Sequence, residues 1–421
     1  MSLINFAYDG EVGPKQFTWH WHVNSYDNKF YPINGVFEDC YYDYHAPLQT
    51  VFEKHNIPTN AVTVKQALKS KEKFVYVLTF RYLRNTILQD LDYNFLLHLP
   101  IGIVQAINSG TCVLVLNDAH ESAFYTKEFY DQLLLNLKFA RIDRKNVIVV
   151  TGNPSNNTIE SPINLVFWQY FETAVRLATE QLTLPSIAYA NNSKLKKFLC
   201  LNRIPREPRY FFMYEMYKRN LLDHFNASLD KVNSLDEIIS YNDNVFMDSI
   251  TDKSEFNKML LTLPWTVDTT EFKVNHWDTN NTTFAHNNLI FIVTETLVKG
   301  DMHNLFLTEK TFKPISLQMP FIVIGQPGTL ARLKELGYKT FSDFWDESYD
   351  DESDDNKRIE KIAQVLKQLN ELDSESKNKL FHCVHDVVEH NWNHFYHGGF
   401  EEILWQELTA MLDAIQQDFN S

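Results

Sequence analysis

The chain has 421 residues, of which 44% are apolar and 14% aromatic, and its formal net charge is −15. This length exceeds what one hydrophobic core usually supports, so two domains are expected. The acidic charge argues against broad electrostatic capture of nucleic acid, which depends on neutralising phosphates. The four cysteines form no CxxC pair, which argues against a disulfide framework and predicts a cytoplasmic protein.

The amino terminus carries neither the basic region nor the apolar core of a secretory signal. A membrane-spanning helix needs about 18 uninterrupted apolar residues, and the sequence contains no such stretch. The sequence therefore predicts no membrane span.

The first half of the chain alternates between two kinds of segment. Short apolar runs rich in β-branched residues end at polar or turn residues, which is typical of strands, and the segments between them have helical spacing. Such alternation predicts a mostly parallel sheet with helices on both faces. The predicted strands are 73–80, 111–118 and 146–153, the predicted helices are 101–110 and 128–140, and a longer helix is expected at 163–182.

A turn-rich segment at 183–194 separates this half from a second one with the same alternation. Within the second half, residues 228–287 are polar and follow no regular pattern, and the carboxyl end is helical. The predicted strands are 197–202, 288–296 and 320–324, and the predicted helices begin at residues 207, 308, 329, 358, 379 and 400.

These elements predict an α/β protein with two Rossmann-like domains that face each other across a cleft. The predicted domains are residues 1–185 and 186–395. The helix in residues 396–421 is expected to cross back onto the first domain.

Three arginines follow the strand predicted at 197–202, in the stretch LNRIPREPRY. In open α/β sheets, ligands bind beyond the carboxyl ends of the strands. Arg203, Arg206 and Arg209 lie there at the start of a helix, where guanidinium groups and the helix amino terminus together favour a phosphate. The alternative is that these are surface arginines paired with Glu207 and Glu215.

A second group of polar residues follows the strand predicted at 288–296. Glu295 ends that strand, and Thr308, Glu309 and Lys310 open the next predicted helix. A carboxylate suits the hydroxyl groups of a ribose, and a lysine suits a diphosphate. The alternative is structural, because threonine is a common helix N-cap and glutamate is favoured in the first helical turn.

Four stretches in this half, LNRIPREPR, IFIVTET, LTEKTFKPI and PFIVIGQPG, resemble the donor-binding half of α1,3-fucosyltransferases. The resemblance covers residues 197–210 and 288–330. It implies a GT-B glycosyltransferase fold with a nucleoside-diphosphate sugar as donor substrate and no tightly bound cofactor. Thr296 stands where that family carries asparagine, so the donor class that carries over is a nucleotide sugar and not specifically a fucose donor.

The resemblance also implies roles for individual side chains. Glu309 would accept hydrogen bonds from the ribose, while Lys310 and either Arg203 or Arg206 would face the diphosphate. Glu295 would lie near the sugar. The cationic side chains would stabilise the charge that develops on the leaving diphosphate, so no metal is required.

A catalytic base is expected from the first domain, because an inverting transfer must deprotonate the acceptor hydroxyl. The stretch NDAHES follows the strand predicted at 111–118. Glu121 is the first choice for the base, Asp118 the second, and His120 would orient either one. The alternative for Asp118 is that it caps the next helix.

Two further stretches are assigned structural roles. In the histidine-rich segment 381–397, His390, His394 and His397 would share one helical face, with a spacing that a zinc site would use. Hydrogen-bonded interior histidines are the preferred interpretation, because no HExxH motif accompanies them. The acidic run at 345–355 is interpreted as a solvated loop.

The sequence as a whole predicts an inverting, metal-independent glycosyltransferase whose acceptor is a glycan or a hydroxylated base in DNA. Two basic stretches, 65–73 and 141–145, would contact the DNA backbone in the second case. An alternative from another class is a non-catalytic sugar-binding protein or a virion or assembly protein that retains the fold.

Overall fold

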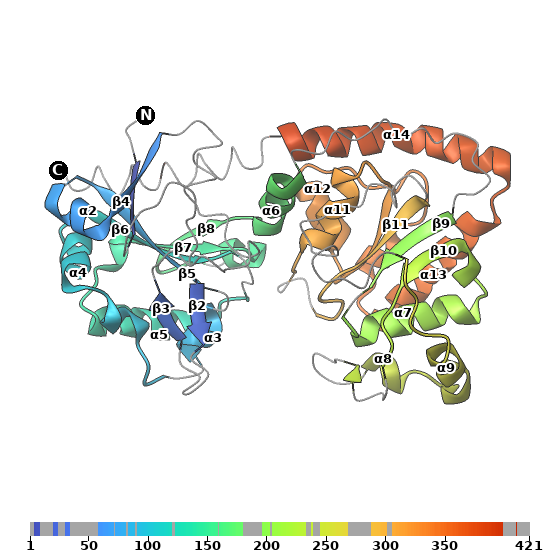
Figure 1. The fold of residues 1–421 in the computed structure, drawn as a ribbon, viewed down its shortest axis with the longest axis horizontal. Helices are drawn as coiled ribbons and strands as arrows, with labels where there is room; N and C mark the ends of the chain where they lie inside the picture. Colours follow the sequence, from blue (N-terminus) through green and yellow to red (C-terminus); the bar gives the residue numbers. More distant parts are fainter. Residues whose placement is uncertain are drawn as a thin grey trace. The chain divides into compact units, whose positions relative to one another are not determined.

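The structure is a computed structural model, and its chain divides into two compact units (Figure 1). Unit 1 comprises residues 1–170 and 399–421, and unit 2 comprises residues 171–398. The structure describes residues 4–8, 20–23, 30–33, 58–70, 72–80, 83–88, 91–119, 123–158, 160–179, 196–202, 204–232, 237–238, 245–267, 288–300, 305–398 and 410. The helix predicted from residue 400 onward lies outside these ranges apart from residue 410, so its crossing back onto the first domain remains a prediction.

In the described part of unit 1, six strands form one parallel sheet in the order β4-β1-β5-β6-β7-β8. The three strands predicted in this half correspond to β5, β6 and β7. A separate antiparallel ribbon pairs β2 (His20–Val23) with β3 (Phe30–Ile33). The sheet strands are β1 (Ile4–Tyr8), β4 (Thr59–Thr63), β5 (Phe74–Thr79), β6 (Cys112–Asp118), β7 (Val147–Thr151) and β8 (Asn164–Phe167).

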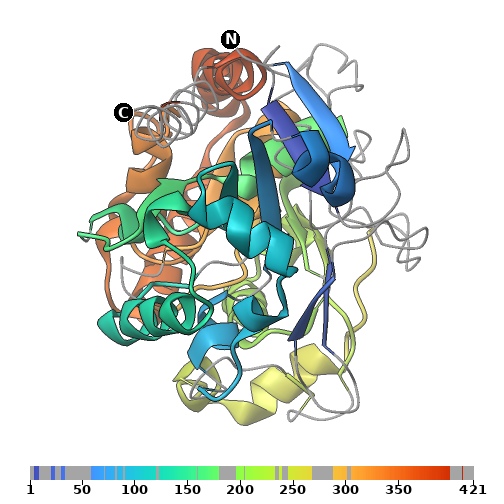
Figure 2. The ribbon, with the colours of Figure 1, turned by 90° about the vertical axis from the view of Figure 1, so that its left-hand side faces the viewer.

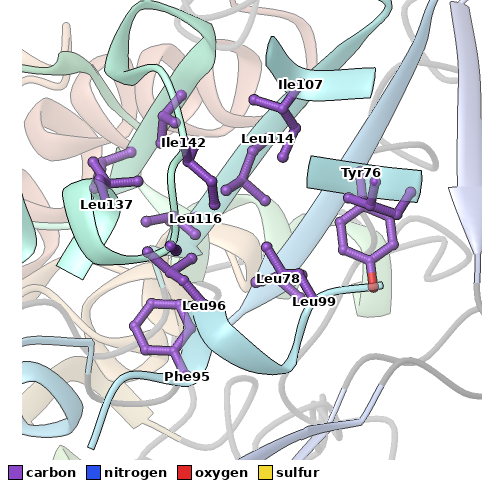
Figure 3. Packing of buried hydrophobic residues seen from close by; sticks show 14 of the residues in the cluster. Tyr76, Leu78, Phe95, Leu96, Leu99, Ile107, Leu114, Leu116, Leu137 and Ile142 are labelled. Carbon is purple, nitrogen blue, oxygen red and sulfur yellow. The ribbon is translucent and has the colours of Figure 1, made fainter. Parts of the chain in front are cut away.

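The helices of unit 1 cover this sheet through an apolar core. Alternate residues of the central strands point to one face, as the two-residue period of a strand requires. Leu114 and Leu116 of β6 meet Ile107 and Leu137 from the helices there (Figure 3). The helical elements that contribute to this core are α2 (Val64–Ser70), α3 (Leu83–Leu88), η1 (Phe95–His98), α4 (Ile101–Asn108) and α5 (Lys127–Phe139).

The single helix predicted at 163–182 is wrong, because this segment contains a strand and a shorter helix. β8 pairs with β7 from residue 164, and Trp168 N donates to Thr151 O at 2.8 Å beyond the strand. Only then does α6 (Tyr170–Thr179) begin. If these residues formed a helix, the backbone groups at the edge of β7 would have no strand to pair with. Pairing with β7 therefore outweighs the helical spacing of the side chains.

In the described part of unit 2, four strands form a second parallel sheet in the order β10-β9-β11-β12. The predicted strands of this half correspond to β9 (Lys196–Leu201), β11 (Asn288–Thr294) and β12 (Phe321–Ile324). The edge strand β10 (Phe225–Ser228) was not predicted, because FNAS is short and carries neither alternation nor β-branched residues. The helix predicted at 207–225 is shorter than expected and ends as α7 (Glu207–Lys218), which is followed by Asn220 with φ of 54°.

Helices surround the sheet of unit 2, and the last of them along the described chain, α14, is long (Figure 1). None of the described helices is both long and apolar enough to span a bilayer. Parallel sheets covered by helices in both units confirm the predicted α/β class with two Rossmann-like units. The remaining helices are α8 (Val245–Asp248), α9 (Lys253–Leu260), α11 (Glu309–Ser316), α12 (Thr329–Glu335), α13 (Asp355–Glu371) and α14 (Ser374–His397).

The histidine-rich segment is one continuous helix that side-chain hydrogen bonds attach to the turn after α12. His390 Nε2 lies 3.1 Å from Gly337 O, and His394 Nε2 lies 2.7 Å from Leu336 O. Asn391 accepts from Lys339 N at 2.8 Å and donates to its carbonyl at 2.9 Å. His390 and His394 are therefore hydrogen bonded to backbone carbonyls, as the preferred interpretation expected, but both are half-buried rather than interior, and His397 is exposed.

The acidic run at 345–355 is only partly the solvated loop that was predicted. Residues Ser348–Asp351 form a 3₁₀ turn (η7) in which Tyr349 and Asp350 are buried. The Asp350 carboxylate accepts from Leu330 N at 2.9 Å and Ala331 N at 3.0 Å. These amides lie in the first turn of α12, where they have no partner within the helix. The Asp350 carboxylate supplies that partner and is buried for this reason.

Helix α6 is held to the rest of unit 2 by polar contacts in the interior. Arg176 Nη1 donates to Phe395 O at 3.3 Å, and the hydroxyls of Thr179 and Tyr396 lie 2.7 Å apart. The Tyr338 hydroxyl donates to the buried Glu172 carboxyl. Burial raises the pKa of Glu172 to about 7, although the Tyr338 hydroxyl and the charges of Arg176 and Arg332 oppose the shift.

We expect Glu172→Gln to weaken the pH dependence of stability between pH 4.5 and about 7. The folded state holds the Glu172 proton more tightly than the unfolded chain, so this group's contribution to the free energy of unfolding falls as pH rises through that interval. The loss amounts to about 3 kcal/mol at most. Urea unfolding across the interval measures it, with the exposed Glu375→Gln as control. Equal slopes for wild type and Glu172→Gln would contradict the assignment.

Candidate functional site

Three helices of unit 2 begin beyond the carboxyl ends of its strands. The chain passes from β9 into α7, from β11 toward α11, and from β12 into α12. This is the edge at which open α/β sheets bind ligands, and each helix start presents backbone amides and a partial positive charge. The residues predicted from the sequence to hold a nucleotide belong to the first two of these connections.

Glu295 joins the end of β11 to the start of α11. It is 2% exposed, and its carboxylate oxygens accept four hydrogen bonds. The donors are Thr308 N at 3.0 Å, Thr308 Oγ1 at 2.6 Å, Thr311 Oγ1 at 2.6 Å and Thr296 N at 3.0 Å. A carboxylate has about four acceptor positions, so Glu295 is saturated. The resemblance placed Glu295 near the sugar, whereas these bonds give it the role of positioning α11.

Lys310 and Glu309 form a partly accessible ion pair in the first turn of α11. Lys310 Nζ lies 2.7 Å from Glu309 Oε1 and also donates to the hydroxyls of Thr296 and Thr308, each at 3.1 Å. The Lys310 side chain is 26% exposed and that of Glu309 16%. Burial raises the pKa of Glu309, but the charges of Lys310 and Lys313 outweigh it and hold the pKa below its ordinary value. The Glu309 carboxyl is therefore ionised at neutral pH.

Two of the three predicted arginines lie in the described part of the site. Arg206 is the N-cap residue of α7, and its Nη1 donates to Thr296 O at 3.1 Å, which links α7 to the end of β11. Arg209 is buried, and its Nη1 donates to Ile204 O at 2.9 Å. Arg203 lies outside the described residues.

The Arg209 guanidinium adds a buried positive charge beside the acidic residues of the site. Burial, with the charge of Arg206, lowers its pKa to about 10, although Cys200, Glu309 and Glu295 act in the opposite direction. Its Nε has no hydrogen-bond partner among the residues that the structure describes. Glu215, one of the acids proposed to pair with these arginines, instead forms ion pairs with Lys218 and Arg219.

The third helix start, after β12, is already occupied by protein groups. Asp350 takes the first amides of α12, and Thr329 Oγ1 donates to Gln326 O at 2.7 Å within the turn. Gly328 has φ of 82°, a conformation that favours glycine. The buried Arg358 donates from Nε to Gly325 O at 3.0 Å. The first amides of α12 are therefore already bound within the protein, and the cationic side chains of this edge lie at the starts of α7 and α11.

Part of this arrangement was not evident from the sequence. Thr296 and Thr311 bind the Glu295 carboxylate, and Asn202 at the end of β9 accepts from Thr294 Oγ1 at 2.5 Å. The available signal was the spacing of Thr308 and Thr311, which places both hydroxyls in the first turn of a helix that follows a strand ending in glutamate.

The candidate base residues belong to unit 1, and the structure describes only one of them. Asp118 ends β6 as predicted, but it is fully buried. Its Oδ1 accepts from Leu83 N at 2.9 Å, and its Oδ2 accepts from Tyr125 OH at 2.7 Å. It therefore contacts the start of α3, whereas the next helix, α5, is capped by Thr126. These contacts favour a structural role for Asp118.

The other two members of the predicted trio, His120 and Glu121, lie outside the described residues. Glu121 remains the first candidate for the base, and the role of His120 in orienting it remains a prediction. Among the residues that the structure describes, no three histidine, cysteine, aspartate or glutamate side chains gather in an arrangement that would hold a metal ion.

Comparison with known proteins gives only weak similarities. No family model and no curated protein matches the chain. An α,α-trehalose-phosphate synthase (UDP-forming) from Burkholderia vietnamiensis is 11% identical, with 88% of this chain and 84% of that chain covered and a TM-score of 0.38. An α,α-trehalose 6-phosphate synthase from Burkholderia multivorans is 10% identical, with 98% and 91% covered and a TM-score of 0.41.

A third structure, of a trehalose-6-phosphate synthase studied with bisubstrate glycomimetics, is 10% identical. The alignment covers 97% of this chain and 93% of that chain, with a TM-score of 0.39. Similarity at this level assigns neither a family nor an activity to the chain.

We expect Glu295→Gln to lower the free energy of unfolding by about 2–3 kcal/mol, because the amide group that replaces one oxygen cannot accept the hydrogen bonds it received. The exposed Glu371, at the end of α13, provides the matched control, and Glu371→Gln should change stability by less than about 1 kcal/mol. Denaturant unfolding measures both. Equal stabilities for the two variants would show that the four contacts do not hold α11.

Proposed function

We propose that this protein is a glycosyltransferase that moves a sugar from a nucleoside-diphosphate sugar to an acceptor hydroxyl. The observation that carries the proposal is the gathering of Arg206, Arg209, Lys310 and Glu309 where α7 and α11 begin. Three cationic side chains suit a diphosphate, and one ionised carboxylate beside them suits a ribose.

In the proposed donor complex, Lys310 and either Arg206 or Arg203 contact the diphosphate. Glu309 accepts hydrogen bonds from the ribose hydroxyls. These cationic side chains also meet the negative charge that grows on the diphosphate as the bond to the sugar breaks, which is how fixed charges lower a reaction barrier. Glu295 acts indirectly by fixing the start of α11, on which Glu309 and Lys310 depend.

In the proposed reaction, the acceptor oxygen attacks the anomeric carbon while Glu121 takes the hydroxyl proton. The diphosphate leaves with the electrons of the broken carbon–oxygen bond, and the configuration at the anomeric carbon is inverted. The proposed acceptor is a glycan or a hydroxylated base in DNA. A protein that binds nucleotide sugars without turnover, in an assembly role, is the alternative that the experiments below distinguish.

We expect nucleoside diphosphates and their sugars to stabilise the wild-type protein in a thermal-shift screen of UDP, GDP, CDP and the corresponding sugar donors. The gain is about 2.7 kcal/mol when the ligand reaches about one hundred times its dissociation constant. Lys310→Ala should remove most of this gain, because it deletes a cation from the diphosphate site. The matched control is Lys357→Ala, whose side chain is 66% exposed on α13. An unchanged response in Lys310→Ala would place the nucleotide elsewhere.

We expect Glu121→Gln to abolish sugar transfer while leaving nucleotide binding intact, because the amide cannot take the acceptor proton. Transfer is measured as release of the nucleoside diphosphate with the donor identified above. Glu128→Gln, an exposed position early in α5, serves as the control. Near-wild-type turnover in Glu121→Gln would reject the base assignment. Nucleotide binding without turnover in the wild-type protein, across glycan and hydroxylated-DNA acceptors, would favour the assembly alternative.

A further inference from the structure

Exposed apolar side chains concentrate on unit 1. Among the residues that the structure describes, eight large hydrophobic side chains are exposed, and six of them belong to α2, α4, α5, η1 and the turn before η1. Single exposed hydrophobic residues are ordinary on a protein surface, whereas a group of them marks an interaction site. The six are Leu68, Leu91, Leu97, Ile101, Leu135 and Phe139, and their exposure ranges from 37% to 77%.

The elements that carry these side chains form one layer. Helices α2, α4 and α5 all contribute to the same core against the sheet and lie on its near side in Figure 2. Leu68 lies against α4, since a methyl group added at Gly102 would be 2.8 Å from its Cδ1. The six side chains therefore lie on the outer surface of a single helical layer.

The turn before η1 is joined to α5 in the same layer. Asn94 Nδ2 donates to Asn136 O at 2.7 Å, and Gln132 Nε2 lies 3.5 Å from Leu91 O. Leu91 therefore lies beside the part of α5 that carries Leu135, which connects the two groups of exposed side chains.

Basic residues border this apolar surface, although the chain as a whole has a net charge of −15. The segments 65–73 and 138–145 contain eight lysines and arginines against two acidic residues. Asn108, at the end of α4, binds Arg141 O at 2.6 Å and Asp143 N at 2.9 Å, so the second basic segment adjoins the helical layer. The exposed basic residues of the two segments are Lys65, Lys69, Lys138, Arg141, Arg144 and Lys145.

We propose that this basic–apolar face, formed by the six apolar and six basic residues named above, docks on an anionic lipid surface. Apolar side chains such as Ile101 and Phe139 insert at the boundary of the acyl chains, and lysines and arginines around them meet the anionic head groups. A nucleic-acid backbone would satisfy the basic residues but would leave Ile101 and Phe139 in water. This inference does not depend on the proposed glycosyltransferase activity.

The test measures partition of the purified full chain onto vesicles by co-sedimentation. Vesicles of phosphatidylcholine alone are compared with vesicles containing equal amounts of phosphatidylcholine and phosphatidylserine. We expect binding to the anionic vesicles only, and its weakening as salt is raised. Equal binding to both kinds of vesicle, or binding to neither, would overturn the proposal.

Two double variants divide the face by chemistry. Lys138→Glu with Arg144→Glu should lower the partition coefficient by about tenfold or more, because each basic residue near an anionic surface contributes roughly fivefold. Ile101→Ser with Phe139→Ser should also lower it by about tenfold or more, because two buried apolar contacts are lost. The control replaces exposed residues of unit 2, Leu261→Ser with Lys357→Glu, and should bind like wild type.

Circular dichroism checks that each variant remains folded, since all four substituted side chains of unit 1 are exposed. Binding of duplex DNA that the charge variant abolishes and the apolar variant retains, without vesicle binding, would assign the face to nucleic acid and reject the proposal. Self-association that disappears in the apolar variant, again without vesicle binding, would assign the face to a second copy of the chain and would also reject it.

Discussion

The candidate site of unit 2 depends on one buried carboxylate. Glu295 lies at the end of a strand, where it is removed from water, and a charge in that place is stable only when its hydrogen-bonding capacity is filled. Two backbone amides and two threonine hydroxyls fill it. The first turn of α11 cannot move away from β11 without breaking several of these bonds together. The ion pair that follows is therefore held on a rigid base.

The same principle explains the neighbouring helix starts. Asp350 fills the amides at the start of α12, and Asp118 in unit 1 does the same for the first amide of α3. In both cases an acidic side chain from a distant part of the sequence replaces the solvent that a helix terminus would otherwise require. The starts of α7 and α11 are distinguished by cationic side chains, Arg206 at α7 and Lys310 at α11.

Much of the fold could be predicted from local pattern. β6 and β11 are short, buried runs with β-branched residues, as predicted for strands. Helix α11 begins after Thr308, the threonine predicted to cap it. The elements that were predicted wrongly are strands that form only by pairing with a neighbouring strand of the sheet. The residues of β8 have helical spacing, yet the open edge of β7 makes them a strand, and β10 has no pattern of its own. No local signal in the sequence states which edge will need a partner.

The sequence predicted which of these residues lie together better than it predicted the contacts that each of them makes. Arg206, Glu295 and Lys310 do meet, because each follows a strand of one parallel sheet and all such ends share an edge. Which carboxylate is buried and saturated, and which is accessible, depends on side chains that reach across the connections. The resemblance assigned Glu295 to the sugar and Glu309 to the ribose, and the structure separates the two carboxylates by burial.

The pairing of Lys310 with Glu309 has a consequence for any anion that enters the site. The Lys310 ammonium group already donates hydrogen bonds to Glu309, Thr296 and Thr308. An incoming oxyanion must therefore displace one of these three acceptors. Where the oxyanion displaces Glu309, one negative group replaces another beside the ammonium group, so the charge around Lys310 changes little. Affinity would be set by the difference between two similar contacts, and it would respond to ionic strength less than a bare cationic pocket would.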